Sequence, residues 1–327
     1  MSDFQEADRI RELIDQELAN RNLSEQPREL YDPIDYILSN GGKRARPVLV
    51  MMACGLFTDE PDISLPAALA VEIFHNFTLV HDDIMDNAPL RRNKPTVHEK
   101  WGDNVAILSG DAMMVKAYEQ LLKCDPHYLA KVLAIFNSAA LNVCEGQQMD
   151  MNFQEAKDVT IEEYVRMIEL KTSTLLAASL KLGAILGGAA DEQADLLWSF
   201  GRNIGIAFQL QDDILDVYGE EGKFGKLVGG DIVAGKKTFL LLKALEMGGD
   251  EVERALSSWV TDVQADTQVQ VSGTREIFDD LNVKELAQEE VKKYHNEGMA
   301  CLEALDVDAS RKAPIKYIAE TLLNREI

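Results

Sequence analysis

The sequence contains little cysteine and no cysteine motif. Its four cysteines, Cys54, Cys124, Cys144 and Cys301, are scattered along the chain without a Cys-x-x-Cys pair. This spacing excludes a disulfide framework or a zinc site and indicates free thiols in a reducing compartment. No apolar signal core follows Met1, and no apolar run looks long and clean enough to span a bilayer. We therefore expect a cytoplasmic protein without a membrane span.

Basic residues are also few compared with acidic ones. The chain has 33 Lys and Arg against 56 Asp and Glu, and its formal net charge is −23. Nucleic acids and anionic membranes require a basic surface, so we expect neither as a partner. A P-loop, a Rossmann glycine pattern and a Ser/His/Asp triad are absent as well. The chemistry should therefore proceed without a protein nucleophile.

Proline is rare after the first third of the chain. Of nine prolines, only Pro314 lies beyond Pro126, and a run without proline suits long helices. Strand-like alternation is limited to a short candidate at 268–271. We predict an all-α protein of about a dozen helices, with core helices over 66–88 and 196–216. No linker or composition shift marks a boundary, so residues 1–327 are expected to form one domain, a large helical bundle.

Two acidic segments of the form DDxxD end the two predicted core helices. They are Asp82-Asp83-Ile84-Met85-Asp86 and Asp212-Asp213-Ile214-Leu215-Asp216. The first and fifth residues of each share a helix face, and the second lies about 100° away. Such carboxylates suit a hard cation such as Mg²⁺, which bridges them to phosphate oxygens. A solvated acidic face is the alternative for one copy, but both copies follow apolar runs, and Asp is a poor helix former.

Basic residues cluster beside these segments. A Gly-Gly-Lys-Arg-Ala-Arg-Pro turn covers residues 41–47, Arg91 and Arg92 follow the first acidic segment, and Lys226 and Lys236 follow the second. Glycine lets backbone N–H groups approach an anion, and arginine can bind phosphate oxygens through two nitrogens. Taken alone, the turn could equally be a solvated helix start. Basic loops beside both acidic segments favour diphosphate binding.

Further candidates are open to two interpretations each. Lys171-Thr172 lies in an apolar helical stretch, where a buried lysine needs a partner such as a phosphate; the alternative is a surface lysine. The polar run 146–150 could be ordinary packing. His75 lies about two turns before Asp82 and shares its face, although a lone histidine on an apolar helix is commonly a core residue.

Together these residues resemble the trans-prenyl diphosphate synthases, the family of farnesyl and geranylgeranyl diphosphate synthases. The resemblance extends from about Gly41 to Thr238 and rests on both DDxxD segments, the basic residues around them, Lys171-Thr172 and Phe208-Gln209. It implies an all-α bundle of the isoprenoid synthase type around an apolar central cavity. It also implies isopentenyl diphosphate and an allylic prenyl diphosphate as ligands, and commonly a homodimer.

The resemblance further implies a role for each candidate residue. About three Mg²⁺ ions would be held by Asp82, Asp86 and Asp212, with Asp83, Asp213 and Asp216 nearby. The allylic diphosphate would be bound by Arg91, Lys171, Lys226 and Lys236. Isopentenyl diphosphate would be bound by Lys43, Arg46, His75 and Arg92. The developing cation would be faced by Gln209, Thr172 and the carbonyl of Lys171.

The implied reaction needs no side-chain base. Ionisation of an allylic C–O bond releases diphosphate, the alkene of isopentenyl diphosphate attacks C1, and a proton leaves to the diphosphate. A class I terpene cyclase is one alternative, but its second metal site typically mixes Asn, Ser or Thr with Glu, and it needs no second diphosphate pocket. A noncatalytic partner subunit is another, although such subunits usually lose Asp-motif residues.

Product length should depend on residues one to two turns before Asp82. These are Phe74, Phe77 and Thr78. Phe77 is large enough to act as a floor beneath the growing chain, although ordinary core packing would also explain it. One aromatic residue there, with an unexpanded DDxxD, resembles the pattern of C20-producing members. We expect products of C15 to C20, with C20 slightly favoured, from dimethylallyl, geranyl or farnesyl starters.

Overall fold

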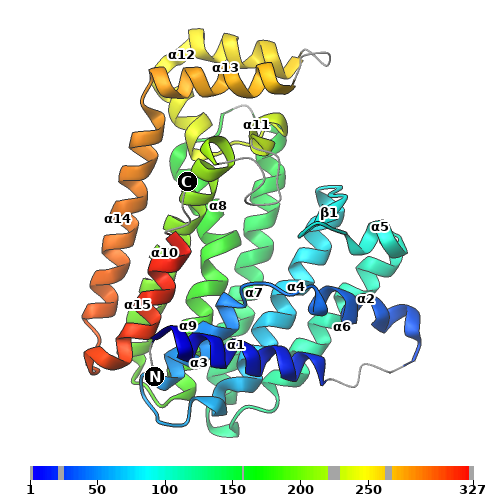
Figure 1. Cartoon of the computed structure of the whole chain (residues 1–327), viewed down its shortest axis with the longest axis vertical. Helices are drawn as coiled ribbons and strands as arrows, with labels where there is room; N and C mark the ends of the chain where they lie inside the picture. Colours follow the sequence, from blue (N-terminus) through cyan, green and yellow to red (C-terminus); the bar gives the residue numbers. More distant parts are fainter. Residues whose placement is uncertain (1–2, 21–25, 157, 220–228, 262–266, 324–327) are drawn as a thin grey trace. The chain divides into compact units, whose positions relative to one another are not determined.

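The computed structural model describes residues 3–20, 26–156, 158–219, 229–261 and 267–323. Within them the chain is almost entirely helical (Figure 1), which confirms the all-α prediction. The α-helices are α1 (Asp3–Ala19), α2 (Arg28–Ser39), α3 (Ala45–Gly55), α4 (Leu65–Met85), α5 (Val97–Trp101), α6 (Asp103–Leu121), α7 (Pro126–Glu155), α8 (Ile161–Ile168), α9 (Thr174–Leu186), α10 (Asp191–Tyr218), α11 (Gly230–Val233), α12 (Phe239–Thr261), α13 (Thr267–Asp280), α14 (Val283–Glu303) and α15 (Ala309–Leu323). The shorter elements are the 3-10 helix η1 (Pro61–Ser64), the π-helix η2 (Glu169–Ser173), and strands β1 (Leu90–Arg91) and β2 (Lys94–Pro95).

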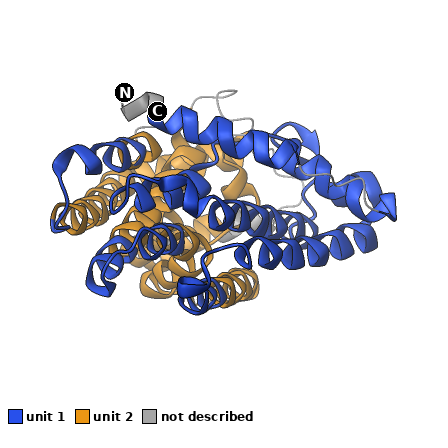
Figure 2. Cartoon of the chain, turned by 90° about the horizontal axis from the view of Figure 1, so that it is seen from below, with its two compact units in different colours: residues 1–138, 178–198, 304–318 blue, residues 139–177, 199–303, 319–327 orange. Residues whose placement is uncertain are grey.

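The chain divides into two compact units, coloured separately in Figure 2. Unit 1 comprises residues 1–138, 178–198 and 304–318, and unit 2 comprises residues 139–177, 199–303 and 319–327. The core of unit 1 includes Ile14, Val50 and Phe74, all fully buried. The core of unit 2 is built on Ile206, Leu210, Ile214, Phe239 and Phe278. The prediction of one domain over 1–327 stays a prediction.

Helix α4 carries the first acidic segment at its end. Pro66 lies in its first turn, where a missing N–H is tolerated. The stretch from Ala67 to Phe74 is buried on all sides, as expected for a helix that is apolar all round. The helix ends at Met85, before Pro89, so the prediction of a core helix over 66–88 is confirmed within a few residues.

The longest helices fall in the stretch without proline, as the sequence predicts. Helix α7 has 30 residues and α10 has 28. Two local expectations are wrong. The strand candidate at 268–271 lies inside α13, and the segment expected to be a loop after Pro89 contains a two-stranded hairpin, in which Leu90 pairs with Pro95 and Arg91 with Lys94.

One apolar segment needs a corrected interpretation. The helical stretch Pro61–Met85 is long and apolar enough to cross a membrane by length and composition, with a mean hydropathy of 1.5. The expectation that no run is long enough was therefore wrong on length. However, 61% of that window is buried inside the protein, and the segment forms part of the core described above.

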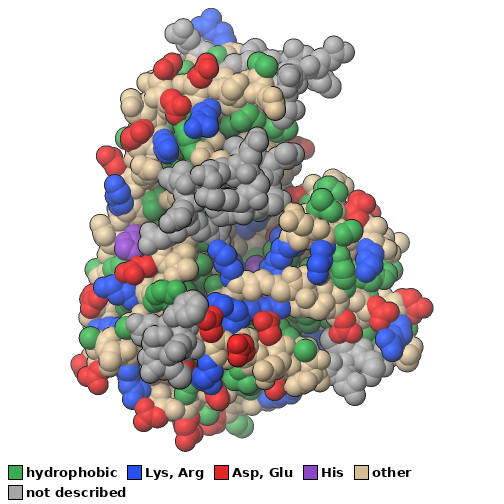
Figure 3. All heavy atoms as spheres, in the orientation of Figure 1, with side chains coloured by type: hydrophobic (Ala, Val, Ile, Leu, Met, Phe, Trp, Pro, Cys, Tyr) green, Lys and Arg blue, Asp and Glu red, His purple; other side chains and the backbone are tan. Residues whose placement is uncertain are grey.

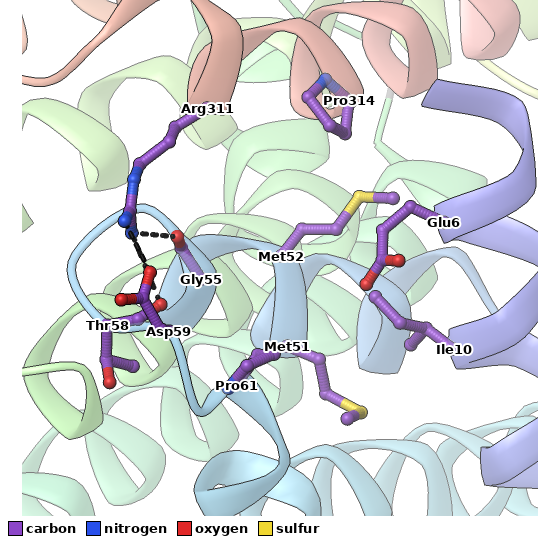
Figure 4. A pocket seen from close by; sticks show the side chains of 10 residues that line it. All are labelled: Glu6, Ile10, Met51, Met52, Gly55, Thr58, Asp59, Pro61, Arg311 and Pro314. Atoms are coloured by element: carbon purple, nitrogen blue, oxygen red, sulfur yellow. Dashed lines mark hydrogen bonds and ion pairs between the residues drawn. The ribbon is translucent and has the colours of Figure 1, made fainter. Parts of the chain in front are cut away.

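Unit 1 also contains a cavity of about 350 Å³, away from the predicted site residues. Its apolar lining includes Ile10, Met51 and Met52 (Figure 4). Arg311 lines it too, but its guanidinium is bound by the carbonyl of Gly55 at 3.1 Å and by Asp59 at 2.5 Å. The charge of Arg311 is therefore already paired within the protein.

Candidate functional site

The first acidic segment presents its three aspartates differently. Asp82 is half-buried and Asp86 is exposed, whereas the side chain of Asp83 is 1% exposed. Arg91 donates hydrogen bonds to that buried carboxylate. Its Nε lies 2.9 Å from both oxygens, and a terminal nitrogen lies 2.7 Å from Oδ1. Burial raises the pKa of Asp83, and the hydrogen bonds from Arg91 oppose that rise. Asp82 and Asp86 are thus the carboxylates with access to solvent, while Asp83 anchors Arg91.

The hairpin after α4 positions Arg92. Its turn residues, Arg92 and Asn93, have φ values of 52° and 61°, as required in a turn of the I′ type that fits two-residue hairpins. The Arg92 guanidinium donates to the carbonyl of Gly41. A Cβ on Gly42 would lie 2.8 Å from that guanidinium, and Gly42 has a φ of 143°. Glycine at 42 therefore lets the arginine lie against the backbone of the basic turn.

His75 and Arg46 form the centre of this basic cluster. A terminal nitrogen of Arg46 lies 3.2 Å from Nε2 of His75. Because arginine can only donate, Nε2 must accept, and His75 is neutral with its proton on Nδ1. Burial and the positive charges of Arg46, Arg92, Arg91 and Arg44 hold the pKa of His75 well below 6.5. Figure 3 shows Lys and Arg side chains gathered around this turn and the hairpin.

Arg44 in the same turn has a structural role. It is 4% exposed and adopts a left-handed conformation with a φ of 49°. Its guanidinium binds Glu72 at 2.6 Å, the carbonyl of Leu38 at 2.6 Å and Asp15 at 2.9 Å. Arg44 therefore fixes the turn that carries Lys43 and Arg46.

The neutral state of His75 predicts a pH dependence of stability. Its pKa is lowered in the folded protein, so between that value and 6.5 the unfolded chain binds a proton that the folded protein does not. Stability from this group is complete above pH 6.5 and falls below it, by about 1.4 kcal/mol per pH unit. In urea unfolding at pH 7.5, 6.5 and 5.5, His75→Gln should show a flatter dependence than the wild type. Identical slopes for both proteins would contradict the assignment.

The second acidic segment, at the end of α10, repeats this division. Asp212 and Asp216 are half-buried, whereas Asp213 is 3% exposed. Asp213 accepts hydrogen bonds from the hydroxyl of Tyr164 and, at 3.2 Å, from Nε2 of Gln209. Burial raises the pKa of Asp213 to about 8, despite the lowering effect of these bonds. In both segments the second aspartate is turned into the protein.

Lys171 and Thr172 lie in the π-helix η2 between α8 and α9. π-Helical turns are rare and often occur at functional sites. Two glycines allow other helices to approach this turn. A Cβ on Gly146 of α7 would lie 2.3 Å from the backbone nitrogen of Lys171, and one on Gly205 of α10 would lie 2.6 Å from Cα of Ser173. The widened turn is thus held by close backbone contacts.

The lysines predicted to bind the allylic diphosphate already have carboxylate neighbours. Lys171 Nζ lies 2.5 Å from Oδ2 of Asp150, so a phosphate is not needed to satisfy it. Lys236 Nζ lies 3.5 Å from Oδ1 of Asp231, whose backbone N–H donates to Asp216 at 2.9 Å. Lys226 lies outside the described residues. Lys236 is therefore tied, through Asp231, to the second acidic segment.

The three residues predicted to limit product length differ in exposure. Phe74 is fully buried and packs against Phe136, with ring centroids 5.2 Å apart. Phe77 is half-buried, and its ring lies 5.6 Å from that of Phe74. Thr78 is also half-buried, and its hydroxyl donates to the carbonyl of His75 at 2.8 Å. Phe77 and Thr78 are the members with open surface, and Phe74 supports Phe77 from beneath.

Comparison with known proteins gives the family. A model of the polyprenyl synthetase family matches residues 27–276. The chain belongs to the polyprenyl synthetase family. It is 40% identical over 303 residues to a geranylgeranyl diphosphate synthase of Methanosarcina mazei, covering 92% of this chain and 91% of that protein.

Two solved structures of this family share the fold. A geranylgeranyl pyrophosphate synthetase from Pyrococcus horikoshii has a TM-score of 0.91 and 36% identity, covering 98% of this chain and 99% of that one. A geranylgeranyl pyrophosphate synthase from Corynebacterium glutamicum, complexed with isoprenyl diphosphate and magnesium, has a TM-score of 0.87 and 27% identity, covering 98% and 99%. These comparisons confirm the resemblance and the isoprenoid synthase fold. This polyprenyl synthetase is a trans-prenyltransferase.

The carboxylates of this polyprenyl synthetase fit a metal that arrives with its substrate. In the part of the chain that the structure describes, no three His, Cys, Asp or Glu side chains are grouped to hold a metal ion by themselves. Mg²⁺ commonly uses one or two carboxylates and takes its other ligands from water and substrate phosphates. The first and fifth aspartates, not the buried second ones, have the exposure for that role.

Sequence reasoning missed the residues that support the site. Tyr164 and Glu72 bind residues of the second acidic segment and of the basic turn, respectively, but belong to no motif noted in the sequence. Asp150, the partner of Lys171, ends the polar run 146–150, for which ordinary packing was an open interpretation. Glu72 lies in an apolar helical run, where a polar residue usually signals a buried partner. That signal was present in the sequence, but it does not name the partner.

Proposed function

We propose that this enzyme condenses isopentenyl diphosphate head-to-tail with an allylic diphosphate. The allylic C1–O bond breaks and its electron pair leaves with diphosphate. The alkene of isopentenyl diphosphate then forms a bond to C1, and the resulting cation loses a proton to the diphosphate. The product is a trans-prenyl diphosphate of C15 to C20, with C20 favoured by the family name that the Methanosarcina and Pyrococcus relatives carry.

The observation that carries this proposal is the basic cluster around His75. Among the described residues, Nε of Arg46 is buried without a hydrogen-bond partner. A buried guanidinium N–H that lacks an acceptor is costly, and a phosphate oxygen would supply one. Because His75 lies about two helical turns before Asp82 on α4, this cluster supports a second diphosphate pocket beside the first acidic segment. A cyclase needs only one diphosphate, and a noncatalytic subunit needs neither acidic segment intact, so neither alternative is favoured.

Each group of residues then has a defined task. Lys43, Arg46, His75 and Arg92 bind isopentenyl diphosphate. Asp82, Asp86 and Asp212 would hold Mg²⁺, about three ions by resemblance, which would supply charge stabilisation for the departing diphosphate. Arg91, Lys171, Lys226 and Lys236 bind the allylic diphosphate. Arg91 is already bound to Asp83. We therefore expect it to act on the allylic diphosphate mainly through its charge.

Thr172 and Gln209 are proposed to face the allylic cation. The hydroxyl of Thr172 donates to Oε1 of Gln209 at 3.1 Å. Both oxygens retain lone pairs beyond this bond, and such fixed dipoles stabilise positive charge without the reorganisation that water would need.

The decisive experiment is elongation by the purified chain alone. Isopentenyl diphosphate is incubated with dimethylallyl, geranyl or farnesyl diphosphate, with Mg²⁺ or with EDTA, and products are separated by chain length. We expect Mg²⁺-dependent elongation from at least one starter, ending at C15 to C20. Hydrocarbon released from an allylic diphosphate alone would indicate a cyclase. No Mg²⁺-dependent product of any kind would support a noncatalytic subunit.

Truncating Phe77 should lengthen the product. Its half-buried ring packs against the buried Phe74, so Phe77→Ala removes the partly exposed member of this pair and opens room for further isoprene units. We expect products beyond C20 with turnover largely retained, measured by reversed-phase chromatography of the dephosphorylated prenols.

Leu79→Ala provides the matched control for Phe77. Leu79 is also half-buried on α4. It comes two residues after Phe77, so it lies about 200° away around the helix. Its truncation should leave the product distribution unchanged. An active Phe77→Ala enzyme with wild-type products would show that Phe77 only packs the core.

Two further properties belong to the proposal. We propose a homodimer, supported by an apolar stripe on unit 1 in which Leu108, Val115 and Leu122 are each 58–64% exposed at seven-residue spacing. Such exposed apolar rows are typical of interaction surfaces. Light scattering on the purified protein measures the mass directly. A cytoplasmic location is supported by four cysteines, none of them in a disulfide, which suit a reducing compartment.

A further inference from the structure

A chain of hydrogen bonds in unit 2 connects Tyr164 to the residues proposed to face the cation. The Tyr164 hydroxyl donates to Oδ2 of Asp213. The other oxygen of that carboxylate accepts from Nε2 of Gln209 at 3.2 Å. Oε1 of Gln209 in turn accepts from the hydroxyl of Thr172 at 3.1 Å. The chain therefore runs from a buried tyrosine on α8, through α10, to the π-helix.

Within this chain, only Asp213 determines which way the Gln209 amide faces. The Thr172 hydroxyl can donate or accept, so it would tolerate either end of the amide. With Oδ2 of Asp213 engaged by the Tyr164 hydroxyl, Oδ1 is left to accept from the NH₂ end of Gln209, and the carbonyl oxygen of Gln209 is turned the opposite way. The orientation of Gln209 thus depends on the carboxylate of Asp213 staying in place.

Tyr164 is the group that holds that carboxylate. The tyrosine is 2% exposed and packs in the unit 2 core, and a tyrosine with two side-chain torsions is rigid when buried. Without the Tyr164 hydroxyl, Oδ2 of Asp213 would be buried and would lose its donor in this series of hydrogen bonds. The carboxylate could then rotate, and the amide of Gln209 would lose its single orienting contact.

We propose that Tyr164 is a positioning residue that acts through Asp213 to keep the carbonyl oxygen of Gln209, and not its NH₂ group, beside the Thr172 hydroxyl. This inference rests on the proposed function, in which Gln209 faces the allylic cation. An amide turned the other way would present its positive end to a developing positive charge. Tyr164 therefore affects the ionisation of the allylic C1–O bond and not the binding of the substrates.

The test is Tyr164→Phe, which removes one oxygen atom and keeps the ring. We expect kcat to fall about tenfold, as supporting groups around a site commonly cost ten- to a hundredfold. The KM values for both diphosphates and the Mg²⁺ concentration for half-maximal rate should change less than about twofold. In a Gln209→Ala background, which lacks the group being positioned, Tyr164→Phe should cause almost no further loss of kcat, because coupled residues are not additive.

Tyr218→Phe is the matched control. Tyr218 is also buried in unit 2, and its hydroxyl donates to a carboxylate, Oδ1 of Asp279, at 2.8 Å. Removing that hydroxyl should cost a similar amount of thermal stability and leave kcat within about twofold of the wild type. A kcat loss common to both variants would mean that Tyr164 is merely structural.

Three results would overturn the inference. They are an unchanged kcat in folded Tyr164→Phe enzyme, an effect confined to KM, and a loss that adds fully to that of Gln209→Ala. If Tyr164→Phe does not fold, Asp213→Asn gives the same test, because an asparagine can present either end to Gln209; it should lower kcat without altering the half-maximal Mg²⁺ concentration. Failure of the wild type to elongate any starter would instead overturn the proposed function.

Discussion

Asp82→Asn should lower kcat by about a thousandfold while the protein stays folded. Asp82 and Asp86 are the solvent-accessible carboxylates of the first acidic segment, since Asp83 is buried against Arg91. A bound Mg²⁺ contributes several kcal/mol to stabilising a leaving group, and about 4 kcal/mol corresponds to a thousandfold in rate. Asparagine keeps the shape but loses the charge that holds the ion. Steady-state kinetics over a Mg²⁺ titration measures both the loss and any shift in metal requirement.

The control for Asp82→Asn is Asp111→Asn. Asp111 is an exposed acid on α6 of the same unit, so it reports the effect of removing one negative charge from an acidic protein. We expect it to keep wild-type kcat and Mg²⁺ dependence. If Asp82→Asn retained more than about a tenth of wild-type activity at every Mg²⁺ concentration, the metal role assigned to the first segment would be wrong.

Gly146→Ala should damage both stability and turnover. A Cβ at 146 would lie 2.3 Å from the backbone nitrogen of Lys171, 2.8 Å from its Cα and 2.9 Å from the carbonyl carbon of Leu170. These are all backbone atoms, so the π-helix itself has to move. Overpacking of this kind costs about 1–3 kcal/mol, and misplacing a substrate-positioning group by about 1 Å can cost a hundredfold in rate. Urea unfolding and kcat measurements would show both losses.

Gly55→Ala separates this steric effect from the general consequences of replacing a helical glycine. A Cβ at Gly55 would meet only Cβ of Pro61, at 3.6 Å, which is an ordinary contact. Because alanine favours helix over glycine, this variant should be as stable as the wild type or slightly more stable. Wild-type stability and turnover in Gly146→Ala would show that the close approach of α7 to the π-helix is not needed.

The motifs that made the function predictable are those whose meaning is carried by residue type and local spacing. Two DDxxD segments at the ends of apolar helices were sufficient to predict metal, diphosphate and helix together, because helical periodicity fixes which side chains share a face. Proline placement likewise predicted the long helices α7 and α10. These inferences needed no information about which helices pack together.

What the sequence did not reveal depends on side-chain contacts that no motif predicts. Helical periodicity places the second aspartate of each segment near the shared face. In the structure, Asp83 is instead buried against Arg91. Asp213 is buried against Tyr164 and Gln209. The hairpin turn at Arg92-Asn93 lacks the Asn-Gly signal that usually marks it. A buried lysine at 171 suggested a phosphate, but Asp150 is its partner. These outcomes depend on which side chains meet in the fold, and spacing along the sequence does not give that.

The π-helix at Glu169–Ser173 also has a consequence for how this gene can change. A π-helical turn holds one residue more than an α-helical turn, so deleting one residue here would let the turn tighten into an α-helix while the helices on either side keep their buried faces. The buried run from Ser173 to Leu180 would then stay in the core, but Lys171 and Thr172 would lose their widened backbone. A one-residue deletion in this turn should accordingly be tolerated by the fold and not by the site.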